Sequence, residues 1–531
     1  MRTLTSRVFA CASLRCAVLL AWLLTLTGCF RFTLGAQGQS LPVGHSGWLD
    51  AQVEALALSA QESAYQLEER DRRSFALRMH SAAAAVRSID VQYYLWNRDL
   101  TGRLLAAELL QAARRGVRVR VLLDDVASKG IDRELAALDT HPLIEIRLFN
   151  PWHTRSFVPG NWLEFVLRRG RPNFRMHNKL WAVDGRMALI GGRNIGDEYF
   201  GANADFNFTD LGVLLVGKAV TDASRSFDHF WNSSLVVPIR TLRKRDRALV
   251  EVGADFDRYR TRMLAGSFAV AALGPEGPRA AALAPVFATL RRSTAVRYVS
   301  DLPDKVNLRE SGIRVLPALS AALQQADREL VLVSPYFVPR RGGVNTLGEL
   351  RQRGVSIHVL TNSLAATDVA AVHGGYSKRR KDLLRAGVNL YELKPDPQMP
   401  RPRQARRESR RQGGVGSKGQ SSGASLHSKG VVVDGHLAFV GSFNLDPRSA
   451  LINTENGVFI DDPVFADAVR QHWVQASDPR RSYAVRLDGR GLTWTHRDGE
   501  AEVTLRREPK AGFVARILAL LFRWLPLEGQ L

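Results

Sequence analysis

The chain carries one chemical pattern twice, beginning at residue 177 and again at residue 427. In each copy a lysine follows the histidine by two positions, an Asp-Gly pair follows it by seven, and an asparagine lies ten positions after the aspartate. The members of the two copies are His177, Lys179, Asp184 and Asn194, and His427, Lys429, Asp434 and Asn444. Agreement at this spacing predicts an internal duplication, so the chain is expected to fold as two related halves.

Each copy has the character of a β-hairpin. Side chains two positions apart point to the same face of a strand, so the histidine and the lysine of each copy project together. Asp184-Gly185 and Asp434-Gly435 are typical of tight two-residue turns, and an apolar stretch follows each of them. We therefore expect the two aspartates to be mainly structural, holding backbone amides or the asparagine of their own motif, with a direct chemical role as the alternative.

The residue types point to phosphate chemistry rather than to a metal site. A charged lysine has no lone pair to donate, so a His-x-Lys pair is a poor metal ligand set. A phosphate group suits it better, because Lys179, Lys429 and the amides of Asn194 and Asn444 can all donate hydrogen bonds to its oxygens. Two imidazoles facing one phosphate could divide the work, one attacking phosphorus and the other protonating the departing oxygen.

Strand-like and helix-like segments alternate in both halves. The first half has strands near 89–95 and 117–123 around a helix near 104–115, and the second has strands near 330–337 and 355–360 around a helix that ends near Arg353. This order predicts parallel strands joined by helical crossovers, with each hairpin added to its sheet. One half-set of reactive residues in each lobe implies a single site shared between the lobes.

The two motifs resemble the paired HKD motifs of the phospholipase D superfamily. Three further segments are similar to the cardiolipin synthase branch of its bacterial members: Ile190–Phe200, Ser334–Pro339 and Asn362–His373. The resemblance runs from about residue 51 to the C-terminus. It implies an α/β fold of two pseudo-symmetric lobes, each a mixed sheet flanked by helices, with one active site at their interface.

The resemblance also implies an activity. A phosphatidyltransferase of the cardiolipin synthase type moves a phosphatidyl group between phospholipids through a phosphatidyl-histidine intermediate, and it needs no metal or organic cofactor. By resemblance His177 is the nucleophile and His427 the acid. A phospholipase D that hydrolyses phospholipids to phosphatidic acid would share every catalytic residue and remains the alternative; a phosphodiesterase acting on nucleic acid is a more distant one.

A catalytic histidine needs its second ring nitrogen held by a carboxylate or a carbonyl group. Asp210 and Glu455, each near the start of the strand that follows the hairpin, are the candidates for this orienting role. The family resemblance supports the role. Surface carboxylates at strand starts are the alternative interpretation.

The net charge and the N-terminal segment predict the cellular location of the protein. The formal net charge is +22, which favours an anionic partner such as nucleic acid, an anionic membrane surface or a phosphate-bearing substrate. Arginines precede an apolar run at 17–26, and Leu26-Thr27-Gly28-Cys29 resembles a bacterial lipobox. We expect a membrane-associated protein of the bacterial cell envelope, lipidated at Cys29, with an uncleaved anchor or a cytosolic start as alternatives. A tether beside lipid disfavours nucleic acid as a partner, and the sequence does not predict the oligomeric state.

A domain order follows from these patterns. The C-terminal helix near 513–525 is amphipathic and could dock on its own lobe or lie in a membrane interface. The expected units are a signal peptide or anchor (1–29), a linker (30–50), a first lobe (51–270), an inter-lobe linker (271–300), a second lobe (301–480) with a mobile basic loop (396–424), and a C-terminal hairpin with the amphipathic helix (481–531).

Overall fold

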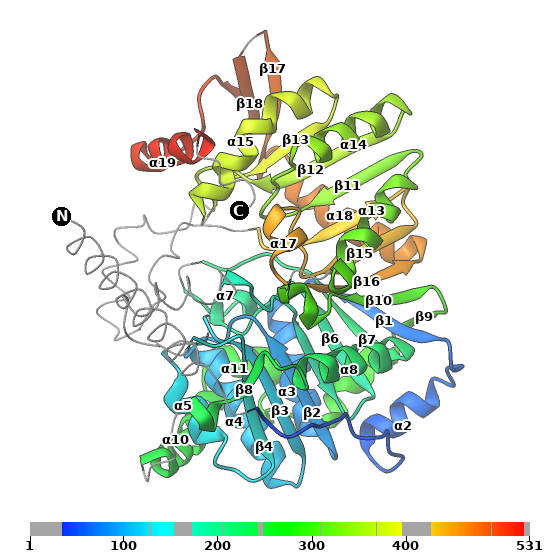
Figure 1. Cartoon of the computed structure of the whole chain (residues 1–531), viewed down its shortest axis with the longest axis vertical. Helices are drawn as coiled ribbons and strands as arrows, with labels where there is room; N and C mark the ends of the chain where they lie inside the picture. The colour runs from blue at the N-terminus through cyan, green and yellow to red at the C-terminus, as the bar shows by residue number, and fades with distance from the viewer. Residues whose placement is uncertain are drawn as a thin grey trace, which may run out of the picture.

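The computed structural model describes residues 34–126, 128, 130–152, 173–204, 206–242, 248–307, 310–367, 369–395, 426–489 and 491–524. These residues form two lobes that follow each other along the long axis of the molecule, each built around one mixed sheet with helices against it (Figure 1). Over the described residues the first sheet has nine strands and the second has ten. The α/β fold of two related lobes expected from the sequence is confirmed. Cys29 and the basic segment 396–424 lie outside the described residues.

The first lobe contains a parallel core extended by antiparallel strands. Strands β2, β3 and β4 pair in parallel, and the hairpin β5-β6 joins the sheet antiparallel to β2. The strand order is β8-β4-β3-β2-β5-β6-β7-β1-β9. In chain order the elements are α2 (Trp48–Ala55), β1 (Ser63–Glu68), α3 (Asp71–Ala84), β2 (Ser88–Tyr93), α4 (Leu100–Arg114), β3 (Arg118–Asp124), α5 (Asp132–Leu138), β4 (Ile144–Phe149), β5 (Leu180–Val183), β6 (Met187–Gly191), α7 (Asp197–Phe200), β7 (Gly212–Gly217), α8 (Lys218–Trp231), β8 (Val236–Pro238), α9 (Ile239–Leu242), α10 (Ala248–Leu264), α11 (Ser267–Leu273), η2 (Ala280–Leu283), α12 (Ala284–Phe287) and β9 (Arg291–Ser293).

The second lobe repeats this plan. Strands β11, β12 and β13 pair in parallel, and the hairpin β14-β15 joins antiparallel to β11. The strand order is β10-β16-β15-β14-β11-β12-β13-β17-β18-β19. Its elements are β10 (Val296–Ser300), η3 (Pro303–Asn307), η4 (Glu310–Gly312), α13 (Val315–Gln324), β11 (Glu329–Val333), α14 (Arg341–Gln352), β12 (Ser356–Asn362), α15 (Ala370–Arg385), β13 (Asn389–Leu393), β14 (Gly430–Val433), β15 (Leu437–Gly441), α17 (Pro447–Leu451), β16 (Asn456–Asp461), α18 (Pro463–Ser477), β17 (Ser482–Asp488), β18 (Gly491–Asp498), β19 (Ala501–Leu505) and α19 (Phe513–Trp524). The strand expected over 330–337 ends at Val333, because Pro335 has no N–H for the ladder.

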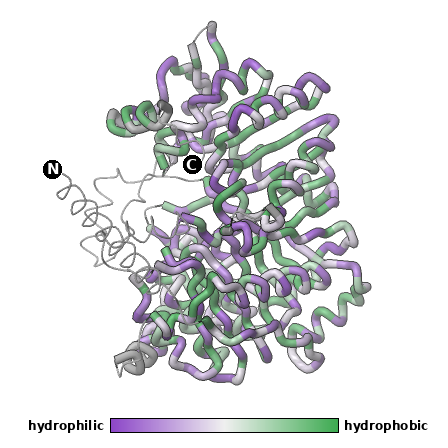
Figure 2. Tube along the Cα trace, in the orientation of Figure 1, coloured by the Kyte–Doolittle hydropathy of each residue, from purple (hydrophilic) through white to green (hydrophobic). Residues whose placement is uncertain are grey.

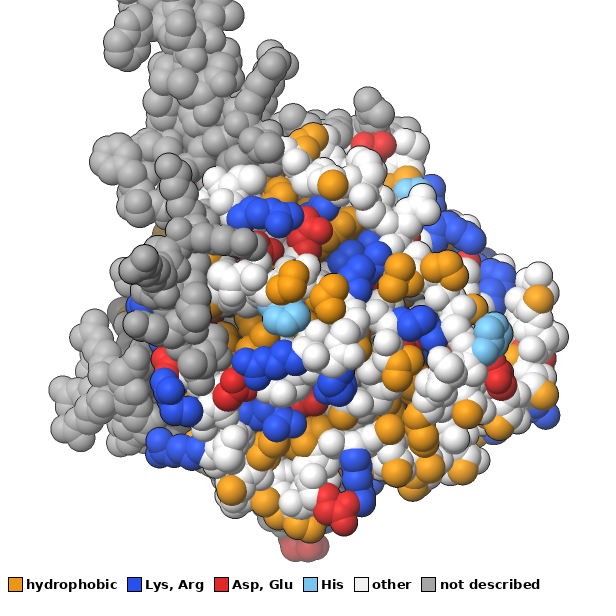
Figure 3. All heavy atoms as spheres, turned by 90° about the horizontal axis from the view of Figure 1, so that it is seen from below, with side chains coloured by type: hydrophobic (Ala, Val, Ile, Leu, Met, Phe, Trp, Pro, Cys, Tyr) orange, Lys and Arg blue, Asp and Glu red, His pale blue; other side chains and the backbone are white. Residues whose placement is uncertain are grey.

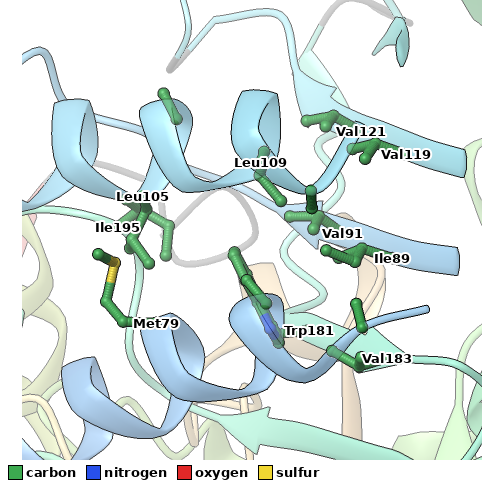
Figure 4. Close-up of a cluster of buried hydrophobic side chains, with 14 of the residues drawn as sticks. Met79, Ile89, Val91, Leu105, Leu109, Val119, Val121, Trp181, Val183 and Ile195 are labelled. Carbon is green, nitrogen blue, oxygen red and sulfur yellow. The ribbon is translucent and has the colours of Figure 1, made fainter. Parts of the chain in front are cut away.

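The core of the first lobe forms where helices α3 and α4 cover one face of the sheet. Asp99 caps α4 by accepting the N–H of Gly102 at 3.0 Å, and Leu105 and Leu109, one turn apart, then face the sheet. Figure 4 shows these leucines and a methionine of α3 gathered over the apolar side chains of β2, β3 and β5. In β2 and β3 these apolar side chains alternate with polar ones on the opposite face, among them Asp90, Gln92 and Arg120, which are also buried. Apolar colours recur along the strands in Figure 2.

Both motif hairpins turn as the sequence predicts. Asp184 and Gly185 have φ of 53° and 64°, and Asp434 and Gly435 have φ of 52° and 74°, the positive values that a tight hairpin turn of this kind requires. The carboxylate of Asp184 accepts the backbone N–H groups of residues 86, 87 and 88, just before and at the start of β2. Asp434 accepts those of residues 327, 328 and 329 in the same way. Each aspartate therefore ties its hairpin to the neighbouring strand.

The lobes meet through a common core. Strand β9 adds to the first sheet beside β1, and β10, only a few residues later, adds to the second sheet beside β16, so the chain crosses between the lobes at this point. One buried apolar cluster contains Leu180 and Val213 of the first lobe together with Val432 and Val458 of the second. The relative position of the lobes is thus set by packed side chains.

The C-terminal part extends the second lobe. Strands β17, β18 and β19 lengthen its sheet, and α19 follows and packs against α15. Among the residues that the structure describes, no helix combines the length and the apolar character needed to cross a bilayer.

Candidate active site

The two motif histidines lie where the lobes meet, and each is held by backbone from the opposite lobe. The N–H of His177 donates to the carbonyl oxygen of Thr454 at 2.9 Å, and the N–H of His427 donates to that of Thr209 at the same distance. Short parallel bridges join Met176 to Thr454 and Thr209 to Leu426. Both histidines are therefore positioned by the lobe interface as well as by their own hairpins.

The orienting carboxylates also cross the interface. Nδ1 of His177 lies 2.8 Å from Oε2 of Glu455, and Nδ1 of His427 lies 2.6 Å from Oδ2 of Asp210. Both carboxylates are fully buried. A carboxylate that accepts from Nδ1–H fixes the tautomer and the ring orientation and leaves Nε2 as the ring atom for chemistry. The sequence identified these two acids as candidates, but it did not indicate that each serves the histidine of the other lobe.

The motif lysines are buried beside their histidines. Nζ of Lys179 donates to the carbonyl oxygen of His177 at 2.7 Å, and Nζ of Lys429 lies 2.9 Å from Nδ1 of His427. Burial lowers the pKa of Lys179 well below its ordinary value, although Glu455 opposes this. A bound anion would favour the charged form of the amine, so the arrangement suits a phosphate ligand.

The motif asparagines lie at the ends of the hairpins, buried near the histidines. Nδ2 of Asn194 donates to the hydroxyl of Tyr199 at 3.0 Å, and the backbone N–H of Asn444 donates to Oγ of Ser449 at 3.2 Å. The Oδ1 atoms of both asparagines are buried without a hydrogen-bond partner among the described residues. An amide oxygen only accepts, so these Oδ1 atoms could take a donor such as a substrate hydroxyl, whereas a phosphate oxygen would need the Nδ2–H groups. Their role in holding phosphate stays a prediction.

The two motif aspartates are placed differently. Asp184 and Asp434 lie beyond the far ends of β5 and β14, and their carboxylates accept the backbone amides described above. They hold the hairpins in place, while the histidines and lysines precede the same strands at the opposite end.

The two half-sites differ in their electrostatics. Burial and the charges of both motif lysines lower the pKa of His177 well below its ordinary value, and burial and Lys429 lower that of His427 to about 3. Burial also raises the pKa of Glu455 to about 7. Burial acts in the same sense on Asp210, but His427 and Lys429 outweigh it and lower the pKa of that carboxyl. Without substrate both imidazoles are neutral, and the negative charge of a phosphodiester would offset the lysines.

Several residues near the histidines had not been predicted from the sequence. The Tyr94 ring lies 5.2 Å from that of His177, and the rings of Tyr199 and Phe208 lie 5.1 and 5.2 Å from that of His427. Tyr94 directly follows β2, and Tyr199 and Phe208 lie in the connection between β6 and β7. An aromatic residue directly after a strand next to a motif hairpin is the signal that could have found Tyr94.

Two further residues that were not predicted from the sequence hold the backbone of the residue before each motif histidine. Oδ2 of Asp124 accepts the N–H of Met176 at 3.0 Å, and Nδ2 of Asn362 donates to the carbonyl oxygen of Leu426 at 3.1 Å. The two residues end equivalent strands, β3 and β12. Their equivalence becomes visible once the two halves are aligned on their strands.

A sequence profile described as "Cardiolipin synthase, PLD-like domain" matches this chain twice, at residues 79–231 and 319–475, once for each lobe. The chain belongs to this cardiolipin synthase family of phospholipase D-like proteins. The resemblance inferred from the motifs is confirmed, and so is the expected enzyme class, a phosphatidyltransferase of the phospholipase D superfamily.

Relatives of this cardiolipin synthase family member span most of its length. It is 40% identical over 471 residues to "Cardiolipin synthase C" of Escherichia coli K12, covering 87% of this chain and 95% of that protein. It is 25% identical over 389 residues to a "Cardiolipin synthase" of Staphylococcus aureus Mu50, covering 73% and 61%. The crystal structure of a phosphatidylserine synthase from Haemophilus influenzae Rd KW20 shares the fold, with a TM-score of 0.54 at 15% identity, over 86% of this chain and 92% of that one.

Proposed function

We propose that this protein transfers a phosphatidyl group from one phospholipid to another through a covalent phosphatidyl-histidine, as a cardiolipin synthase. The observation that carries the proposal is the pair of histidines at the lobe interface, each held at Nδ1 by the carboxylate of the other lobe. A two-step displacement at phosphorus requires one imidazole with a free Nε2 as nucleophile and a second one that carries a proton at Nε2 once the phosphodiester is bound. The 40% identical relative named a cardiolipin synthase supports the choice of phospholipids as substrates.

In the first step Nε2 of His177 attacks the phosphorus of the donor. A bond forms between this nitrogen and phosphorus, and the bond between phosphorus and the headgroup alcohol breaks. His427, protonated at Nε2, gives its proton to the leaving oxygen. The headgroup alcohol then departs and leaves phosphatidyl-His177 beside a neutral His427.

In the second step an acceptor lipid enters with a free hydroxyl group. His427 removes the hydroxyl proton, the oxygen attacks phosphorus, and the bond to His177 breaks. Both histidines return to their starting protonation states. Lys179, Lys429 and the amides of Asn194 and Asn444 would stabilise the charge on the non-bridging phosphate oxygens, which is greatest in the five-coordinate state.

The proposal places the enzyme at a membrane of the bacterial cell envelope, tethered through Cys29. Replacement Cys29→Ser should then abolish labelling of the protein by radioactive palmitate. Unchanged labelling would exclude Cys29 as the acylation site while leaving the chemistry untouched.

Product analysis tests the proposal against hydrolysis. A phosphatidyl-histidine can react with water or with an alcohol, and a site that excludes water beside concentrated headgroups favours the alcohol. Purified protein reconstituted with phosphatidylglycerol vesicles is expected to form a product with two phosphatidyl groups, with phosphatidic acid as the minor product, and to do so in excess EDTA. If phosphatidic acid dominates at every lipid concentration, the protein is a phospholipase D.

A further inference from the structure

Helix α19 exposes an apolar face to solvent. Val514, Ile517, Leu520 and Leu521 are 69%, 41%, 56% and 56% exposed, whereas Ala519 is 7% exposed. At 3.6 residues per turn the four exposed side chains fall within about a third of the helix circumference, and Ala519 lies on the other side. The tube of α19 is accordingly drawn in largely apolar colours at the edge of the molecule in Figure 2.

The inner side of α19 is fixed to the second lobe, so its outer face stays exposed. The helix packs on α15, and the segment before it is held by Glu508. Oε1 of Glu508 lies 3.0 Å from Nε2 of His373, and Oε2 lies 3.1 Å from Nη1 of Arg380, both on α15. The side chain of Arg516 donates to the carbonyl oxygen of Glu508 at 2.8 Å. Because Arg380 and His373 are buried and hold the partly buried Glu508, the outer face of α19 is not free to fold back onto the lobe.

Basic residues lie on α19 and in the segment just before it. Arg507, Lys510 and Arg516 are all exposed, and the acid among them, Glu508, is already paired with Arg380 and His373. An apolar helix face flanked by cations is the pattern of a helix that lies in the interface of an anionic membrane. At the opposite end of the molecule, basic side chains are interspersed with acidic and apolar ones (Figure 3).

The position of α19 relates it to the candidate active site. Helix α15, on which it packs, begins eight residues after Asn362, which holds the carbonyl oxygen of the residue before His427. In Figure 1, α19 and α7 lie at the same edge of the molecule, and α7 contributes Tyr199 to the surroundings of His427.

We propose that α19 inserts its apolar face into the headgroup region of an anionic bilayer and so orients the second lobe on the membrane. The partner is a lipid surface rather than a second copy of the chain, because the cations on α19 and just before it would repel their own copies and attract anionic headgroups. The proposal adds a docking surface and does not depend on the chemistry proposed for the histidines.

A local probe on the full-length protein tests insertion. An environment-sensitive dye is attached through a non-natural residue in place of Leu521, and in a matched protein in place of Val464, a 57% exposed residue of α18. With vesicles of phosphatidylcholine and phosphatidylglycerol, the emission at position 521 should shift to the blue and be quenched by brominated lipids. The dye at position 464 should keep its aqueous spectrum.

Two outcomes would overturn the proposal. One is an aqueous spectrum of the dye at position 521 while the protein is bound to vesicles. The other is a blue shift without lipid that grows with protein concentration, which would indicate contact between copies of the chain.

Two double variants separate the apolar and the electrostatic parts. Leu520→Glu with Leu521→Glu should weaken quenching at a dye placed at position 517 by at least about tenfold, because burial of two leucine side chains is lost. Arg507→Glu with Lys510→Glu should remove the preference for phosphatidylglycerol over pure phosphatidylcholine vesicles. If both double variants insert like the parent protein, the helix is not the docking element. Turnover of short-chain phospholipids in solution reports on the histidines separately, so insertion without turnover would count against the proposed function alone.

Discussion

The two half-sites descend from the same pattern, yet their histidines have different surroundings. Within the part of the chain that the structure describes, His177 has one aromatic neighbour, Tyr94, and a glutamate whose pKa is raised to about 7. In the same residues His427 has two aromatic neighbours and an aspartate whose pKa is lowered. The two copies carry the same reactive groups, and the different residues around them make the two half-sites unequal.

One pair of equivalent positions shows how the carboxylates differ. In the second lobe Ser442 donates its hydroxyl proton to Oε2 of Glu455, the atom that faces His177. The equivalent residue of the first lobe is Gly192, where a Cβ atom would lie 2.3 Å from Oδ1 of Asp210. Glycine is therefore required for the aspartate to approach, while the serine shares the glutamate with the histidine.

The different pKa values of the two orienting carboxylates favour different roles for the two histidines. An acid must carry its proton before the reaction begins, and an ionised carboxylate stabilises the imidazolium that results. Asp210 is ionised throughout the neutral range, whereas Glu455 titrates near neutrality. This comparison supports His427 as the acid and then the base, and His177 as the nucleophile.

The largest expected effect comes from removing either imidazole. His177→Ala and His427→Ala should each reduce turnover on the order of 10⁴-fold or more, because nucleophile and acid act as one unit. Lipid products measured by mass spectrometry test this, with circular dichroism as the check of folding. A single variant with near-normal turnover would exclude the shared site.

The same two variants can reveal which histidine is the nucleophile. A phosphatidyl ester of nitrophenol has a leaving group that departs without a proton from an acid. The His427→Ala variant should therefore still form the phosphatidyl adduct on His177. Rapid denaturation should then recover this acid-labile adduct. His177→Ala should form none. An adduct on His427 in the His177→Ala variant would reverse the roles.

What could be predicted from the sequence was local. The hairpins follow from strand alternation and from the Asp-Gly turns, whose backbone needs are satisfied within a few residues. The fold of each lobe followed from alternating strands and helices. The motif residues were found because both copies kept them at the same spacing.

The exchange of carboxylates between the lobes could not be predicted in this way. His177 and Glu455 are 278 positions apart, and His427 and Asp210 are 217 apart. Their pairing depends on how two lobes pack through a common core, and no pattern in either half encodes it. The aromatic neighbours Tyr199 and Phe208 were missed for the same reason, since their connection contacts the histidine of the other lobe.

Neutralising the orienting carboxylates should have a smaller and unequal effect. Asp210→Asn should lower turnover by about 100-fold and Glu455→Gln by about tenfold. Losses of about 10- to 100-fold are typical when the carboxylate that orients a functional histidine is removed. The loss should be larger for Asp210 because its negative charge stabilises the protonated His427. Initial rates near pH 7 check the ranking, with Glu502→Gln on exposed β19 as the control. Equal losses, or a larger loss for Glu455→Gln, would contradict the assigned roles.

The same two substitutions should change the free energy of unfolding in opposite directions. The folded pKa of Glu455 is raised to about 7, so the folded state holds the proton more tightly than the unfolded chain, and stability falls as pH rises from about 4.5 to about 7. Glutamine mimics the neutral acid. The free energy of unfolding of Glu455→Gln should therefore match that of the parent near pH 4.5 and exceed it near pH 8 by up to about 3 kcal/mol.

The pKa of Asp210 is lowered instead, so its charge stabilises the fold above its unfolded pKa, and that stabilisation is lost as pH falls. Asp210→Asn should therefore be less stable than the parent near pH 8, with the gap closing in acid. Denaturant unfolding across this pH range measures both differences, and two shifts of the same sign would show that the carboxylates are electrostatically equivalent after all.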